Sequence, residues 1–226
     1  MKAMVYPTLT RAAVVSLLAL VAIDFILIGI HVSCPVGPWD GSCRLGHEGG
    51  LAELVGYLKL SIAAGLLAGM AIRNRAAVLA AWALALLVVV ADDALQLHEI
   101  WGGALTSEWD LPAVLGLRSQ DLGELLVWAG LAALVVPVLA LAHHHASDRR
   151  ARSISWQLML LAAALAFFAI GADMLGQALM DTAGTPLGVV EEGGELFLPT
   201  LILVAVIAAE TSDGPAPREK GAGLRE

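Results

Sequence analysis

The chain alternates between long apolar stretches and short polar connections, and this pattern is the first guide to its fold. Six apolar runs each have about the 20 residues that an α-helix needs to cross a bilayer. No run shows the period-two alternation of a membrane β-barrel, and a helix satisfies its own backbone hydrogen bonds in lipid. The predicted spans lie at about 12–31, 51–72, 76–98, 121–142, 154–177 and 188–209.

These runs predict an all-α fold, a polytopic membrane bundle of six transmembrane helices. We expect one membrane domain over residues 1–209 and a disordered cytoplasmic tail over residues 210–226, which is rich in Gly, Pro and mixed charge. Hydrophobic residues make up 58% of the chain, more than a soluble domain carries. No basic surface of the kind that binds nucleic acid is present, so the bilayer is the expected partner.

The charges of the chain are segregated between the two sides of this six-span arrangement, although the net charge is −8. Only Arg44 and Arg118 fall on one side, and Lys59 lies within the second span. Because Lys and Arg accumulate in cytoplasmic loops, this distribution places both termini in the cytoplasm of a cell-membrane protein. The residues on the cytoplasmic side are Lys2, Arg11, Arg73, Arg75, Arg149, Arg150, Arg152, Arg218, Lys220 and Arg225.

The first outer loop, residues 31–50, is rich in Gly and Pro and contains Cys34 and Cys43. On the oxidising side of the membrane these cysteines are expected to form a disulfide. The alternative is a pair of thiolate ligands or redox thiols. Eight intervening residues argue against a C-x-x-C redox motif.

The third predicted span ends in an acidic segment, residues 92–99, that includes a histidine. Charged groups at membrane depth are costly, so they indicate a functional site. If residues 92–99 continue the helix at about 100° per residue, Asp92, Gln96 and Glu99 share one seam. Asp93 then flanks the seam on one side, and His98 lies roughly 100° round on the other.

Other spans are expected to bring polar groups to the same depth, in the outer third of the membrane at about 1.5 Å per residue. Several carboxylates in a low-dielectric site cannot all stay ionised without compensation. A bound metal can neutralise them, they can share protons, or an aqueous funnel can solvate them. The groups are Glu53 and Tyr57, then Asp121, Glu124 and Trp128, then Asp173 and Gln177, and finally Glu191, Glu192 and Glu195.

Carboxylates combined with imidazole suit Zn, Fe or Mn, so a divalent metal ion is the expected cofactor. The sequence assigns no catalytic residue. The expected ligands are Asp92, His98, Glu99, Glu124, Asp173, Glu191 and Glu195. Groups that would orient or replace them are Glu53, Tyr57, Asp93, Gln96, Gln177, Glu192, His31 and His47.

Simpler interpretations compete for several of these residues. Glu53 and Asp121 could be first-turn charges that meet the helix dipole, and His98 could be an interfacial histidine with its hydrogen bonds satisfied. Deeper in the membrane, Asp24 and Lys59 are expected to form a buried ion pair between the first two spans rather than a proton relay.

Two acidic motifs carry a resemblance to known proteins. The pattern Asp92-Asp93-x-x-x-x-His98-Glu99, followed by Glu191-Glu192-x-x-Glu195, resembles a set of uncharacterised bacterial and archaeal multipass membrane proteins. The resemblance implies that the two acidic segments work together, and it implies no particular activity.

Three functions remain open. The first is a membrane metalloprotein with an outward-facing carboxylate and histidine site, which could be a metal-dependent enzyme acting on a membrane-soluble or periplasmic substrate. The second is a transporter for protons or cations, although the inner halves of the spans are mostly Ala, Leu and Val. The third is a non-catalytic subunit of a larger membrane complex, or a homo-oligomer, because small residues of the second span permit close helix packing.

Overall fold

The computed structural model describes residues 10–34, 43–47, 49–114, 116–172, 174 and 186–212, and these residues are almost entirely helical. The part of the chain described contains no β-strand, only an isolated bridge between Val114 and Leu117. The helices are α1 (Arg11–Ser33), α2 (Leu51–Asn74), α3 (Ala77–Ala94), α4 (Leu97–Trp109), α5 (Ser119–His145), α6 (Arg149–Ala166), the π-helical η1 (Phe167–Ala172) and α8 (Pro186–Thr211).

Six helices of the described chain are long and apolar enough to cross a membrane, which confirms the all-α fold and the six predicted spans. They are α1, α2, α3, α5, the continuous segment Arg149–Gly171 formed by α6 and most of η1, and Glu191–Thr211 of α8. The short helix α4 connects α3 to α5, and only its first two residues fall within a predicted span.

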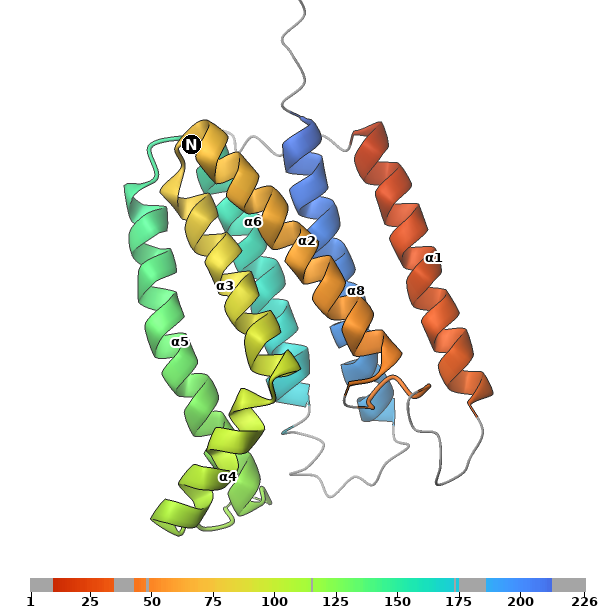
Figure 1. The fold of residues 1–226 in the computed structure, drawn as a ribbon, viewed down its shortest axis with the longest axis vertical. Helices are drawn as coiled ribbons and strands as arrows, with labels where there is room; N and C mark the ends of the chain where they lie inside the picture. The colour runs from red at the N-terminus through yellow and green to blue at the C-terminus, as the bar shows by residue number, and fades with distance from the viewer. Residues whose placement is uncertain are drawn as a thin grey trace, which may run out of the picture.

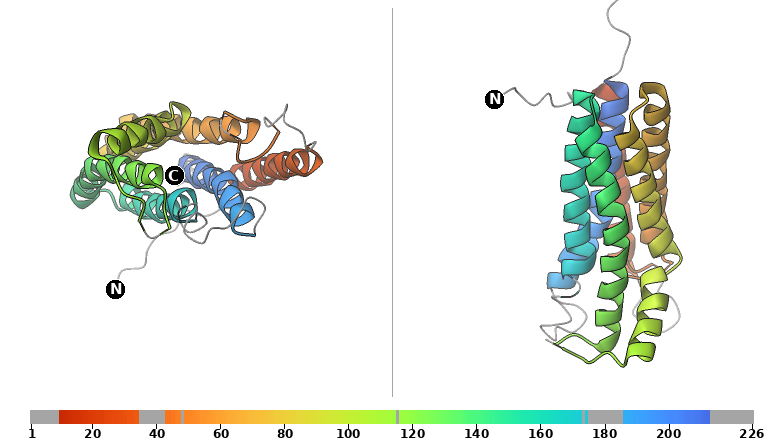
Figure 2. Two further views of the ribbon diagram at one scale, coloured as in Figure 1. Left: turned by 90° about the horizontal axis from the view of Figure 1, so that it is seen from below. Right: turned by 90° about the vertical axis from the view of Figure 1, so that its left-hand side faces the viewer.

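The long helices run up and down, so that the start of α1 and the end of α8 meet at one end of the bundle (Figures 1 and 2). The hydroxyl oxygens of Thr10 and Thr211 lie 2.5 Å apart and join these two ends. At the opposite end lie α4 and the loop that precedes α2 (Figure 1). Most of the predicted tail, residues 213–226, lies outside the described residues, whereas positions 210 and 211 continue α8.

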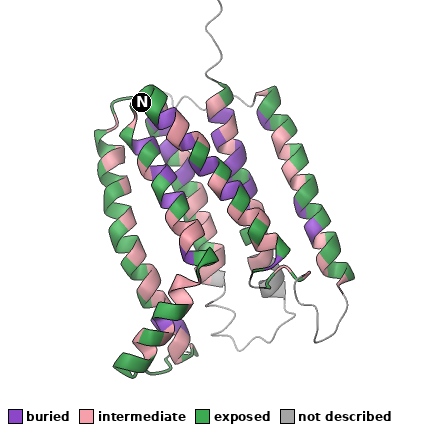
Figure 3. Ribbon diagram, in the orientation of Figure 1, coloured by how far each residue is buried: buried purple, intermediate pink, exposed green. Residues whose placement is uncertain are grey.

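The apolar core lies in the half of the bundle nearer those joined ends, where α2, α3, α6 and α8 surround it (Figure 3). Its largest fully buried side chains include Leu67, Met70, Leu79, Leu158 and Ile202. Helix α1 packs against α8, and α5 packs against α3 and α4. The core therefore leaves the other half of the bundle free to hold polar groups.

A buried ion pair links the first two spans at the boundary between these halves. Lys59 Nζ donates a hydrogen bond to the carboxylate of Asp24, which is fully buried. This ion pair confirms the predicted pairing. Helix α8 completes the pair: Thr200 Oγ1 donates to Asp24 Oδ2 at 2.7 Å, and Lys59 Nζ also donates to the Leu196 carbonyl at 3.3 Å. Three helices thus share one neutral polar network inside the membrane.

Removing one member of this network should leave an uncompensated buried charge. We expect Lys59→Met to cost about 3–5 kcal/mol of stability, seen as a large drop in the unfolding temperature in detergent. The double variant Lys59→Met with Asp24→Asn should recover much of that loss. Arg73→Met, which breaks the half-exposed pair with Glu210, is the control and should change little. Equal effects of Lys59→Met and Arg73→Met would contradict the prediction.

Candidate functional site

The acidic segment that closes the third span is not a continuous helix, so the predicted seam through Asp92, Gln96 and Glu99 is wrong. Helix α3 ends at Ala94, and Gln96 has left-handed backbone angles, with φ 51° and ψ 39°. The Gln96 amide donates a hydrogen bond to the Asp93 carbonyl at 3.0 Å, and a new helix, α4, begins at Leu97. A left-handed residue redirects the chain, so a constant angular step cannot be counted across it.

The break brings His98 back beside Asp92. Nδ1 of His98 lies 2.9 Å from Oδ2 of Asp92, whose exposed fraction is 1%. The other oxygen, Oδ1, is buried and has no hydrogen-bond partner among the described residues. An Nδ1–H donated to the carboxylate leaves the lone pair of His98 Nε2 available to a ligand. That nitrogen lies 3.9 Å from Glu99 Oε1.

Helix α5 supports this arrangement from the other side. The indole of Trp128 stacks on the His98 ring, with centroids 5.0 Å apart. Gln120 Nε2 donates both to the Glu99 carbonyl at 3.1 Å and to Glu124 Oε1 at 2.8 Å. These contacts place Glu99 of α4 and Glu124 of α5 side by side.

Two glycines allow α4 and α5 to approach closely enough for these contacts. A Cβ on Gly123 would collide with the Gly102 carbonyl oxygen, and one on Gly102 would collide with the Glu124 backbone. Thr106 bridges the two helices, because its hydroxyl lies 2.9 Å from the carbonyls of both Gly102 and Ser119. The position of α4 thus depends on backbone-to-backbone packing.

A cavity of about 300 Å³ lies at this end of the bundle, and most of the predicted site residues line it. Every span except the first contributes to its wall, together with α4 and the first outer loop. No Lys or Arg is among the described lining residues. The predicted residues that line it are Glu53, Tyr57, Asp93, His98, Glu99, Glu124, Glu191, Glu192 and Glu195.

Uncharged groups hold Glu53 of α2 in place. Glu53 Oε2 accepts hydrogen bonds from the Gly49 amide at 2.7 Å and from the Tyr57 hydroxyl at 3.0 Å. These two hydrogen bonds orient the carboxylate but do not neutralise its charge. On α8, the carboxylate of Glu192 lies close to Gly46, where an added Cβ would come within 2.8 Å of Oε1.

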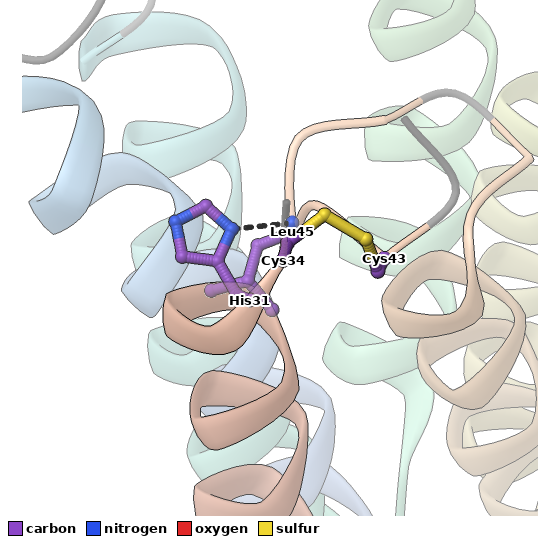
Figure 4. Close-up of a disulfide and its surroundings, with 4 residues drawn as sticks. All are labelled: His31, Cys34, Cys43 and Leu45. Carbon is purple, nitrogen blue, oxygen red and sulfur yellow. Dashed lines mark hydrogen bonds between the residues drawn. A yellow bond between two sulfur atoms is a disulfide. The ribbon is translucent and has the colours of Figure 1, made fainter. Parts of the chain in front are cut away.

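The first outer loop is tied to α1 and reaches the cavity through Leu45 (Figure 4). Cys34 and Cys43 form a disulfide with Cα atoms 5.8 Å apart, as predicted. His31 Nδ1 accepts a hydrogen bond from the Leu45 amide at 3.0 Å. His31 therefore positions the loop, His47 is exposed, and neither is among the residues that line the cavity.

Several other polar residues that the sequence analysis singled out do not line the cavity. Asp92 contacts His98 but does not line the cavity. Gln96 forms the left-handed turn between α3 and α4. Asp121 is buried in a capping box with Arg118, whose side chain neutralises it. Asp173 and Gln177 lie outside the described residues.

Sequence reasoning missed the π-helical segment η1, which contributes Ala169 and Ile170 to the cavity wall. An apolar run carries no periodic signal that separates a π-helix from an α-helix. A contact with Gly194 of α8 accompanies the segment, because a Cβ there would collide with the Phe168 ring. π-Helical turns occur frequently at functional sites.

The structure does not assemble the predicted set of seven ligands. Within the described ranges, no three His, Cys, Asp or Glu side chains converge to hold a metal ion. Two potential ligand atoms that face the cavity, His98 Nε2 and Glu99 Oε1, lie 3.9 Å apart. Asp92 takes the role of orienting His98 through Nδ1.

Comparison with known proteins places the chain in a family. The model of a domain of unknown function, DUF8692, matches residues 12–209. The chain belongs to this family. The DUF8692 range covers the helical bundle from the first turn of α1 to the last turns of α8, and so it includes the whole cavity. No curated protein and no solved structure matches the chain.

The close packing of α4 on α5 can be tested with a matched pair of glycine substitutions. Gly123→Ala should separate the helices and cost about 1–3 kcal/mol, measured as a lower unfolding temperature in detergent. Gly130→Ala on the same helix meets nothing within 4 Å and should leave that temperature unchanged or slightly higher. Similar behaviour of the two variants would show that α4 is not held by this contact.

The pairing of His98 with Asp92 should make stability depend on pH. The hydrogen bond to Asp92 raises the pKa of His98 above its ordinary value, against the opposing effect of burial, and nearby acids add to the rise. Its stabilisation is therefore complete below the unfolded pKa of about 6.5 and is lost as the pH rises through the folded pKa.

We expect Asp92→Asn to lower the unfolding temperature more at about pH 6 than at about pH 9, with a chelator present. Glu108→Gln, an exposed outer acid, is the control and should shift the temperature equally little at both values. A deficit in Asp92→Asn that does not vary with pH would contradict the assignment.

Proposed function

We propose that the chain is an integral membrane metalloprotein that binds a divalent metal ion in the cavity, with His98 Nε2 and Glu99 as the first two ligands. The observation that supports this most directly is the hydrogen bond between Asp92 and His98. Histidines that bind metals usually donate their other ring N–H to a carboxylate or carbonyl, which fixes the ring and strengthens the ligand. The buried carboxylate of Asp92 lies in that supporting position.

The charge around the cavity supports the same proposal. Seven carboxylates line it: Glu53, Asp93, Glu99, Glu124, Glu191, Glu192 and Glu195. Glu53 and Glu124 have neutral hydrogen-bond partners, so those contacts leave the negative charge in place. Carboxylates near one another in a low-dielectric region are stabilised by a cation. A carboxylate and imidazole donor set suits Zn, Fe or Mn.

The cavity faces away from the basic end of the bundle, and we place it on the extracytoplasmic side of the cell membrane. The joined ends at Thr10 and Thr211 lie at the opposite end, next to Arg73 and Arg150. Basic residues accumulate on the cytoplasmic side of membrane proteins. Ligands would therefore enter from outside the cell or from the outer leaflet.

A bound metal ion in this position would supply Lewis-acid or redox chemistry. The chain's own residues would hold that ion, orient His98 and shield one ring face with Trp128. An enzyme acting on a membrane-soluble or periplasmic substrate is the form of this function that fits an outward-facing cavity.

Transport is less well supported than binding. The inner half of the described bundle is filled by fully buried apolar side chains such as Leu67, Leu79 and Ile202. The polar network around Asp24 and Lys59 is internally neutralised and stops above this core. A cation would find no continuous polar path among these side chains.

The proposal is tested by metal binding to the purified protein in a neutral detergent. Wild type should bind about one equivalent of Zn, Fe or Mn by titration calorimetry and elemental analysis. His98→Ala should abolish binding, and Asp92→Asn should weaken it about 10–100-fold. His47→Ala, an exposed histidine outside the cavity lining, should bind like wild type.

Absence of stoichiometric metal in the wild type, even after supplementation, would count against the proposal. Unchanged affinity in His98→Ala would do the same.

A further inference from the structure

The cavity has two chemically different layers along the bundle axis. On several helices, an acid near the outer end is followed one turn deeper by an apolar residue that also lines the cavity. A step of four residues corresponds to about 6 Å along a helix and keeps both side chains on one face. The pairs, acid first, are Asp93 and Val89 on α3, Glu124 and Trp128 on α5, and Glu195 and Pro199 on α8.

Apolar residues from the remaining helices continue the deeper layer. Leu60 of α2 is almost fully buried, and Leu165 contributes from α6. The acids thus form an outer collar, and the residues beneath them form an apolar floor. A single metal ion with its waters would use only the collar.

The size of the cavity points to a larger ligand. Its volume of about 300 Å³ equals roughly ten water molecules at about 30 Å³ each. It also reaches the lower end of the range for small-molecule sites, about 300–1,000 Å³. An apolar floor of this kind is stabilised by contact with apolar groups rather than with water.

The charge of the collar selects a cation. The described lining includes seven carboxylates and no Lys or Arg, and the nearest lysine beneath it, Lys59, is engaged with Asp24. Behind the cavity wall, Asp92 Oδ1 is buried without a hydrogen-bond partner, which places an unsatisfied carboxylate oxygen beside His98. A positively charged head in the collar would stabilise both sets of oxygens.

We infer that the cavity binds an amphiphilic amine, with its cationic head in the acidic collar and its apolar chain on the floor that Val89, Leu165 and Pro199 help to form. The head lies toward the outer end and the chain toward the membrane interior, which is the orientation of an amphiphile in the outer leaflet. The inference uses the cavity of the proposed function and names its substrate class.

The test compares three probes by titration calorimetry on the full-length protein in a neutral maltoside detergent containing a chelator. Octyltrimethylammonium has both head and chain, tetramethylammonium has only the head, and octanol has only the chain. We expect octyltrimethylammonium to bind at least about tenfold more tightly than either partial probe, because each buried methylene adds to the affinity. Equal affinity of the two ammonium ions, or no binding of either, would overturn the inference.

Matched variants separate the two layers. Glu53→Gln combined with Glu192→Gln should weaken octyltrimethylammonium binding about tenfold or more, whereas Glu108→Gln should not. Val89→Phe should fill the floor and remove the advantage of the octyl chain while tetramethylammonium binding persists. Val136→Phe on the exposed face of α5 is its control. Wild-type affinity in both the collar and the floor variants would show that the probe binds elsewhere.

The outcome also separates this inference from the proposed function. Binding of octyltrimethylammonium in chelator, with no metal binding in the separate titration, would support the amine site and remove the metalloprotein proposal. Metal binding that requires His98, with no discrimination among the three probes, would overturn the amine site and leave the metalloprotein proposal standing.

Discussion

The cost of placing charge inside a membrane constrains this structure more than any other factor. Each deeply buried acid in the described chain has a specific partner: Asp24 has Lys59 and Thr200, Asp121 has Arg118, and Asp92 has His98. The first two acids are neutralised by residues with permanent charge. Asp92 is different, because its partner is a histidine and one of its oxygens remains unsatisfied. That incomplete compensation occurs beside the cavity.

The same constraint explains why the bundle has two unlike halves. Toward the joined ends of α1 and α8, close-packed apolar side chains fill the core, and a buried hydrogen bond such as that from Trp82 Nε1 to Ser155 Oγ, 2.8 Å, joins two uncharged groups. Toward the other end, α4 and the disulfide-bonded loop surround a cavity with acidic walls. The network of Asp24 and Lys59 lies between the halves and holds α1, α2 and α8 together there. The close-packed half can thus position the half that contains the acidic cavity, where like charges repel.

Much of the fold followed from the sequence, because membrane spans depend on local hydrophobicity. The six spans, the disulfide and the pairing of Asp24 with Lys59 were predicted and are present. For the site, seven acids that the sequence analysis singled out, from four of the long helices and α4, line one cavity. The ligand set was less predictable. Asp92 and His31 were both named as candidate ligands, yet Asp92 orients His98, and His31 holds the disulfide-bonded loop at Leu45.

The sequence by itself determined which segments form helices long and apolar enough to cross a membrane and which acids lie near the ends of those helices, because both depend only on composition and on residue spacing along a helix. Only the tertiary structure decided which atoms face one another. The left-handed turn at Gln96, the contact between Gly102 and Gly123, and the π-helical turn of η1 each redirect side chains without any local signature in composition. A change of direction at one residue moves every later side chain, so roles within the site are set by packing between helices rather than by periodicity along one of them.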